Sequence, residues 1–376
     1  MNTLAEVCTK WSLDSQRCTI SLLKLREEFI LPEMPVMIRT IYTEIVSKYP
    51  RENPVIRDIP GTELPSFSMS YFCSDAISKW IQKNTFTGHR YTNTSTSRPG
   101  SVVLSCMIPI GDHASHRVDV LHKAKRVAVI ADILELESVH INMWLSPYCK
   151  FFPKQPNDQL TFDHLNSGAT NTRTIDIWRS EESSKVLVHE LIHCANSHFM
   201  EIDKHQFTNR FKVTDCSMVR PYEAFVEWQA IIFHICFICK ELGVDPQYLQ
   251  YLFHNEYMFG VIQTAKMLKH FKFESWEECI SSKVPSLHAI DQETDAISYI
   301  IIKTALLNDS SYWFSYCDTQ KIAWTMCCNS TKFYEWIDDA INNKNHAKNI
   351  NVALGQVHSV NEIDSLRMSA IEVAHV

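Results

Sequence analysis

The residues best able to do chemistry lie in the stretch His189 to His193, which spells HELIH. On an α-helix, residues four positions apart share a face, so the imidazoles of His189 and His193 can point to one place. Two imidazoles in this arrangement suit a zinc ion, and Glu190 between them can reach a water molecule on the open side of the metal. The stretch therefore predicts a zinc site with Glu190 as the general base.

The sequence around this motif predicts a buried helix. Ser180 suits the N-cap, and Glu181 and Glu182 are expected in the first turn, where the helix dipole favours anions. From Val186 to Ala195, apolar residues occupy several sides of the helix. Histidines and a glutamate inside a buried helix are costly unless a metal or other partners satisfy them. Because HExxH also arises by chance, a third ligand is needed.

A second strong helix is predicted to begin at Pro221 and to end before Gly243. Glu223 and Glu227 are four positions apart on a face that is otherwise apolar, so both are expected to point inward. Zinc sites built on HExxH commonly take a third ligand from a glutamate on a later helix. Glu223, which follows His193 by 30 positions, is the predicted ligand, and Glu227 is expected to orient a histidine ligand from behind.

Other candidates for the third ligand fit less well. A different zinc class reads HExxHxxGxxH, and Asn196 and Phe199 stand where that pattern needs Gly and His. His198 is one position out of register, and Asp215 is held in reserve in the intervening loop. His234 is too far along the second helix, about 16 Å from the predicted ligand at about 1.5 Å per residue, and is expected to be a core histidine.

A hydrolytic zinc site also needs a donor for the oxyanion that forms during the reaction. Tyr299, in a helix predicted over residues 291–307, is the first candidate for this catalytic role. His254 and His288 are the alternatives, and each is also explained as an ordinary core or surface residue.

The overall pattern predicts an α+β fold that is mainly helical. Strands are expected at residues 101–110, 139–145 and 173–178, and an exposed loop at residues 84–100. The last of these strands precedes the HExxH helix and is expected to form the cleft edge, where an extended peptide can pair by strand addition. The expected regions are an N-terminal helical region (1–75), a lobe with the small mixed sheet and HExxH helix (76–200), a helical C-terminal lobe with the Glu ligand (201–342) and a polar tail (343–376).

Composition narrows the functional classes. The chain has 376 residues, a formal net charge of −7 and no nucleic-acid-binding motif, so we expect no nucleic-acid partner. The start of the sequence lacks the pattern of a signal peptide, and no apolar run is long enough to predict a membrane span. The 13 cysteines, including Cys236 and Cys239 in a lone CxxC and the adjacent Cys327 and Cys328, indicate free thiols in a reducing, cytoplasmic setting.

The motifs together resemble a known group of enzymes. HELIH at 189–193 with YEAFVE at 222–227 is similar to the gluzincin clan of zinc metallopeptidases. More narrowly, WRSEESSKVLVHELIH, HLNSGAT and ETDAISYIIIK resemble zincin-like proteins encoded by large DNA viruses, over roughly residues 139–305. The resemblance implies a two-lobed zincin fold, the zinc ligands and base named above, and a viral origin. Glu227 stands where many relatives have Asp.

The function expected from these patterns is hydrolysis of peptide bonds by a zinc-activated water, with a peptide or protein as substrate. The first alternative is a catalytically silent zincin-fold structural or interaction protein, for example a virus particle component with virion or self-association partners. The second alternative is a zinc hydrolase that acts on a non-peptide amide. The expected location is the cytoplasm, or host cytoplasm and virion for a viral protein.

Overall fold

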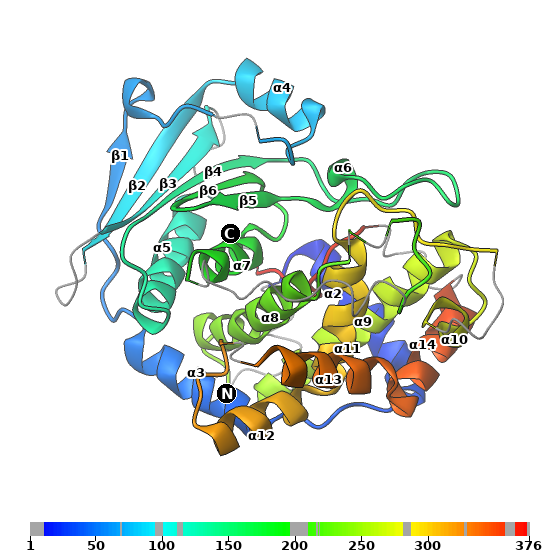
Figure 1. Ribbon diagram of the computed structural model, residues 1–376. Helices are drawn as coiled ribbons and strands as arrows, with labels where there is room; N and C mark the ends of the chain where they lie inside the picture. Colours follow the sequence, from blue (N-terminus) through cyan, green and yellow to red (C-terminus); the bar gives the residue numbers. More distant parts are fainter. Residues whose placement is uncertain are drawn as a thin grey trace.

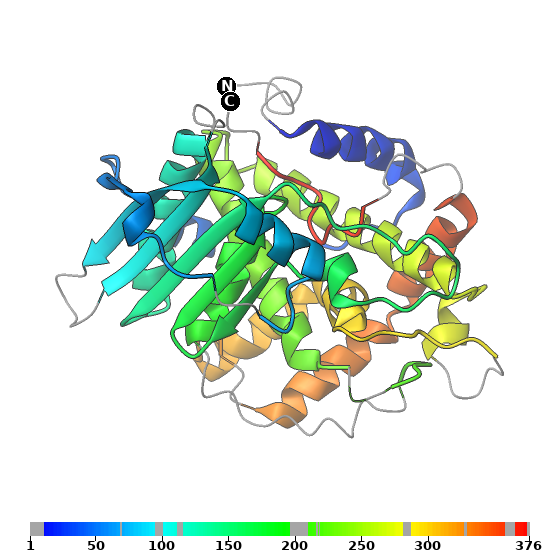
Figure 2. The same cartoon turned by 90° about the horizontal axis from the view of Figure 1, so that it is seen from above.

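The computed structural model describes residues 11–67, 70–94, 101–110, 116–195, 210–215, 217, 219–280, 287–326, 329–357 and 365–373. They form an α+β fold, as the sequence predicts, in which one mixed sheet lies over a larger group of helices (Figure 1). Strands β1 to β3 lie at one side of the molecule and α14 at the opposite side (Figure 2).

The sheet has six strands in the order β1-β2-β3-β4-β6-β5. They are β1 (Ile56–Ile59), β2 (Phe86–Thr94), β3 (Ser101–Pro109), β4 (Val139–Ser146), β5 (Gly168–Asn171) and β6 (Thr174–Arg179). The β3–β4 and β4–β6 pairs are parallel, and the β1–β2, β2–β3 and β5–β6 pairs are antiparallel. The predicted strands at 101–110, 139–145 and 173–178 are confirmed as β3, β4 and β6.

Two predictions about the sheet are wrong. The exposed loop predicted at residues 84–100 contains β2, whose polar side chains have partners on neighbouring strands: His89 pairs with Asp58 and Arg90 contacts Ser105. The last strand before the HExxH helix is not the edge, because β6 lies between β4 and β5. The edge is β5, a short strand that folds back along β6 through a tight turn in which Thr172 has φ 51°.

The helices make up most of the fold. They are α2 (Leu13–Leu25), α3 (Val36–Lys48), α4 (Asp75–Lys83), α5 (His116–Ile133), α6 (Phe162–Leu165), α7 (Ser183–Ala195), α8 (Pro221–Glu241), α9 (Tyr248–His270), α10 (Trp276–Ile280), α11 (Lys303–Asn308), α12 (Ser310–Gln320), α13 (Ser330–Ile341) and α14 (Lys344–Gln356). Short 3-10 turns η1 (Arg26–Glu28) and η2 (Gly61–Glu63) follow α2 and β1, and a π-helical turn η5 (Ile297–Ile302) runs into α11.

The two faces of the sheet are covered differently. Helix α4 lies on one face, where Ile77 and Ile81 pack with Trp144 and Trp178 in a small separate core. Helices α5 and α7 lie under the other face, which belongs to the main core (Figure 1). That core extends from Trp11 through the helices, so the strands and the helical part share one hydrophobic interior.

Helix α8 is the central helix of the core. It begins at Pro221 and is followed by Gly243 in a left-handed conformation, φ 64°, as the sequence predicts. By length and composition it could cross a membrane, but 89% of its most apolar segment is buried inside the protein. Its apolar length therefore fits a helix surrounded by other elements of the same chain.

The segment predicted as a polar tail, 343–376, is instead part of the packed structure over its described residues. Residues 344–356 form α14, and residues 365–373 run through the core with Leu366 and Ile371 buried. Buried carboxylates satisfy its backbone: Glu182 accepts from Met368 and Ser369 N–H groups at 2.9 and 2.6 Å. This support comes from residues far away in the sequence, so the local composition gave no sign of it.

Helices α9 and α11 approach closely where α9 has a glycine. A Cβ at Gly260 would lie 2.3 Å from the Thr304 hydroxyl oxygen, so Gly260→Ala must push the helices apart and should destabilise the fold by about 1–3 kcal/mol. The matched control is Gly355→Ala, at an exposed position of α14 where nothing lies within 4 Å and up to about 1 kcal/mol of stability should be gained. Urea unfolding measures both changes, and equal effects would contradict the close approach.

A second stability prediction concerns His346, which is fully buried in α14. Burial lowers its pKa to about 3, whereas an unfolded histidine has a pKa of about 6.5. Below pH 6.5 the imidazole of His346 therefore binds a proton in the unfolded chain and stays neutral in the folded chain. The free energy of unfolding consequently falls as the pH falls. His346→Leu should reduce the loss of stability between pH 7.5 and pH 5 by about 2 kcal/mol in urea unfolding. An unchanged loss would contradict the buried neutral imidazole.

Candidate metal centre

Helices α7 and α8 pack together and bring the three predicted ligands to one place. His189 and His193 lie one turn apart on α7, and Glu223 lies in the first turn of α8. The two imidazole Nε2 atoms are 3.0 Å apart. The nearest Glu223 oxygen is 3.2 Å from His193 Nε2 and 3.6 Å from His189 Nε2. Three ligand atoms on two helices thus converge on one point.

The three ligand atoms fit a single ion. All lie within 4.8 Å of one another. An ion about 2.0–2.1 Å from each atom in tetrahedral coordination would separate the atoms by about 3.3–3.4 Å, which lies within the range of the three observed distances. Two imidazoles and one carboxylate are a donor set typical of zinc with an open fourth position. Among the described residues, this is the one cluster of its kind.

Glu227 lies behind His189, where the sequence places an orienting acid. One of its oxygens is 2.8 Å from His189 Nδ1, and the other accepts a hydrogen bond of 2.5 Å from Lys185. Burial disfavours the charged imidazole, but hydrogen bonds to Glu223 and Glu227 outweigh it and raise the pKa of His189 to about 9. Against its own burial, Glu227 has a pKa held below its usual value by Lys185 and His189. The carboxylates of Glu223 and Glu227 thus stabilise a positive charge at His189.

Glu190 faces the edge strand of the sheet. Its carboxylate accepts a hydrogen bond of 2.6 Å from the Thr170 hydroxyl on β5. Gly168 on the same strand is close enough that a Cβ there would lie 3.1 Å from the other Glu190 oxygen. The predicted base, Glu190, is therefore held between α7 and β5, next to His189.

Tyr299 reaches the cluster from the π-helical turn η5. Its hydroxyl donates to Glu223 at 3.2 Å, and its ring meets the His189 ring edge-on with centroids 5.8 Å apart. Burial and the nearby Glu223 raise the pKa of Tyr299 above its ordinary value, so the phenol stays protonated and able to donate. Single π-helical turns are often found at functional sites. The oxyanion role remains a prediction.

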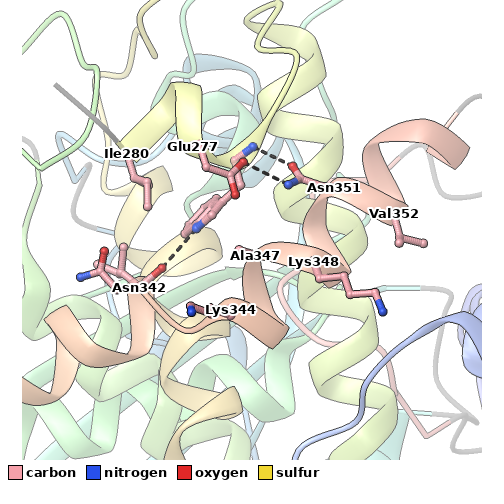
Figure 3. A pocket seen from close by; sticks show the side chains of 10 residues that line it. Glu277, Ile280, Asn342, Lys344, Ala347, Lys348, Asn351 and Val352 are labelled. Atoms are coloured by element: carbon pink, nitrogen blue, oxygen red, sulfur yellow. Dashed lines mark hydrogen bonds between the residues drawn. The ribbon is translucent and has the colours of Figure 1, made fainter. Parts of the chain in front are cut away.

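The cavity beside these residues is small. It has a volume of about 40 Å³ between the start of β5 and α7, and His189, Glu190 and Tyr299 help to line it. A larger hollow of about 660 Å³ lies between α10 and α14 (Figure 3). There the Glu277 carboxylate is engaged by Asn351. Neither histidine nor cysteine is among the described residues that line it, so it offers no comparable chemistry.

The alternative site residues lie elsewhere. His234 accepts from Arg126 and donates to the Ile371 carbonyl, and burial lowers its pKa to about 3, which fits the predicted core histidine. His254 contacts the Pro32 carbonyl. The remaining alternatives do not join the cluster within the described structure: Asp215 is exposed, His288 packs against Phe273, and His198 is outside the described residues.

Every cysteine that the structure describes is a free thiol. Cys236 and Cys239 are buried free thiols, and burial raises the pKa of the Cys239 thiol to about 11. Cys327 and Cys328 are outside the described residues.

Helix α7 begins later in the sequence than predicted. The helix begins at Ser183, so Glu181 and Glu182 precede it instead of occupying its first turn. Both carboxylates bind Lys150: Glu181 accepts from its backbone N–H, and Glu182 from its ammonium group, each at 2.6 Å. Pairing with a buried lysine replaces the expected interaction with the helix dipole.

Two residues at the site were not identified from the sequence. Lys185 had a usable signal, because it is a charged residue one turn before His189 in an otherwise apolar helix. Thr170 had none, because its contact with Glu190 depends on how the hairpin β5–β6 lies against α7.

Comparison with models of known protein families, with curated proteins and with solved structures finds nothing that matches this chain. The description of the site therefore depends on its own geometry.

The convergence of the three ligands predicts the effect of removing one. Wild-type protein should hold about one zinc per chain after exposure to zinc, measured by elemental analysis. Loss of a residue that only hydrogen-bonds a ligand weakens metal binding by roughly 10- to 100-fold. Glu223→Ala removes a ligand itself and should weaken zinc binding by more than that. Asp215→Ala, at the exposed reserve position, should bind zinc like the wild type. Zinc retained by the first variant and lost by the second would contradict this ligand set.

Proposed function

We propose that this chain is a zinc-dependent peptidase with a zincin-like fold, in which His189, His193 and Glu223 hold the metal and Glu190 is the general base. The observation that carries the proposal is the convergence of the three ligand atoms within 4.8 Å, with Glu190 one residue from His189. Zinc bound there would polarise the scissile carbonyl and lower the pKa of a water molecule.

Three residues of the chain would then have separate roles in the reaction. Glu190 takes the proton of the attacking water and passes it to the leaving amine. The Thr170 hydroxyl, 2.6 Å from Glu190, holds the carboxylate in one rotamer. Tyr299, released from Glu223 when that carboxylate binds the metal, can donate its hydroxyl to the developing oxyanion.

The edge strand supports a peptide as the substrate. Trp178 N–H donates to the Ser167 carbonyl, and the antiparallel ladder alternates from there, so the backbone groups of Gly168 and Thr170 face away from β6. Among the described residues, these outward groups have no hydrogen-bond partner. An extended peptide can pair with them and place one of its carbonyl groups beside Glu190.

The small cavity supports a second candidate, a zinc hydrolase that acts on a small non-peptide amide. A volume of about 40 Å³ admits a few atoms and no large side chain. The outward-facing groups of β5 favour the peptidase. Cleavage of acetylated amines without cleavage of peptides would favour this second candidate.

The test of the proposed function is Glu190→Gln. Turnover of a random peptide library, followed by mass spectrometry of the products, should fall by at least about 100-fold because the proton acceptor is gone. Zinc content should stay at the wild-type value, because Glu190 is not a ligand. The matched control is Glu137→Gln, an exposed carboxylate that should leave turnover unchanged. Full activity of Glu190→Gln would rule out this mechanism.

A further inference from the structure

Lys185 is a buried cation placed on the same face of α7 as His189. The two residues are four positions apart, and both reach the carboxylate of Glu227 on α8. Lys185 binds one oxygen at 2.5 Å, and His189 Nδ1 lies 2.8 Å from the other. The side chains of Lys185 and Glu227 are 2% and 1% exposed, so water does not compete for these contacts.

The two contacts fix the Glu227 carboxylate in one orientation. A glutamate side chain has one more rotatable bond than an aspartate side chain, and so has more freedom to turn. With both oxygens engaged, the carboxylate cannot rotate without breaking a buried charge-assisted hydrogen bond. Partners of this kind fix the tautomer and the ring orientation of a metal-binding histidine.

A second buried lysine, Lys150, forms an ion pair whose carboxylate does not contact a predicted metal ligand. Lys150 binds Glu182 at 2.6 Å, with both side chains 1% exposed. Glu182 also accepts from the backbone of Met368 and Ser369, so this pair anchors the C-terminal segment. The two lysines are alike in burial and pairing, but Lys185 alone of the two shares its carboxylate with a predicted ligand.

We infer that Lys185 is a positioning residue for the metal site, which holds Glu227 so that His189 presents its Nε2 atom to the ion. The inference rests on the proposed zinc site. The orientation of His189 by Lys185 and Glu227 applies to the metal-free protein as well. A purely structural ion pair would contribute to stability alone.

The experiment compares Lys185→Met with Lys150→Met. Zinc affinity is measured in the folded variants by competition with a chelator. The hydrogen-bonded Nδ1 proton of His189 is followed by NMR of the metal-free proteins. Lys185→Met should bind zinc about 10- to 100-fold more weakly than the wild type and should lose or broaden the proton signal. Lys150→Met should stay within about threefold of the wild type and keep the signal.

Other outcomes overturn the inference. Wild-type affinity and an intact signal in Lys185→Met would show a structural ion pair, as would equal losses in both lysine variants. If Lys185→Met does not fold, Lys185→Gln replaces the cation by a weaker, neutral donor and should show a smaller loss of zinc affinity in the same direction. If wild-type protein binds no zinc, the proposed function fails, and the proton signal decides alone: its loss confined to Lys185→Met supports positioning of His189, and its persistence contradicts it.

Discussion

The carboxylate of Glu227 joins the two helices on which the candidate site depends. It binds Lys185 and His189 of α7 at 2.5 and 2.8 Å, and it is buried near the N-terminal end of α8. Buried charges cost free energy unless they are paired, so the core tolerates these charged groups because the packing of α7 against α8 brings them together. The same packing places Glu223 beside the two histidines. The positions of the three candidate ligands thus depend on a buried ion pair as well as on apolar contacts.

The sheet contributes the other half of the site. Strand β5 is short, is the last strand of the sheet among the described residues, and lies against α7 at the buried Glu190. Gly168 permits the close approach, and Thr170 provides the hydroxyl that fixes the carboxylate. A larger residue at 168 would contact Glu190, so the composition of the edge strand and the position of the Glu190 carboxylate depend on each other.

Much of the fold could be predicted, since the periodicity of α7 and α8 and the apolar runs of β3 and β4 are local signals. The errors share one cause. Strand β2 is polar and finds its partners on β1 and β3, and β5 is defined by its pairing with β6. The backbone of residues 365–373 donates to carboxylates of other elements. Interactions between residues far apart in sequence stabilise all three, so their local patterns resemble loops.

The sequence by itself determined which residues share a helix face: His189 with His193, and Glu223 with Glu227. A helical repeat of about 3.6 residues is enough for that conclusion, because it concerns one helix at a time. Only the tertiary structure decided that the two faces meet, with a Glu223 oxygen 3.6 Å from His189 Nε2 and Thr170 against Glu190. The approach of separate elements depends on side-chain packing over the whole core, and no local period encodes it.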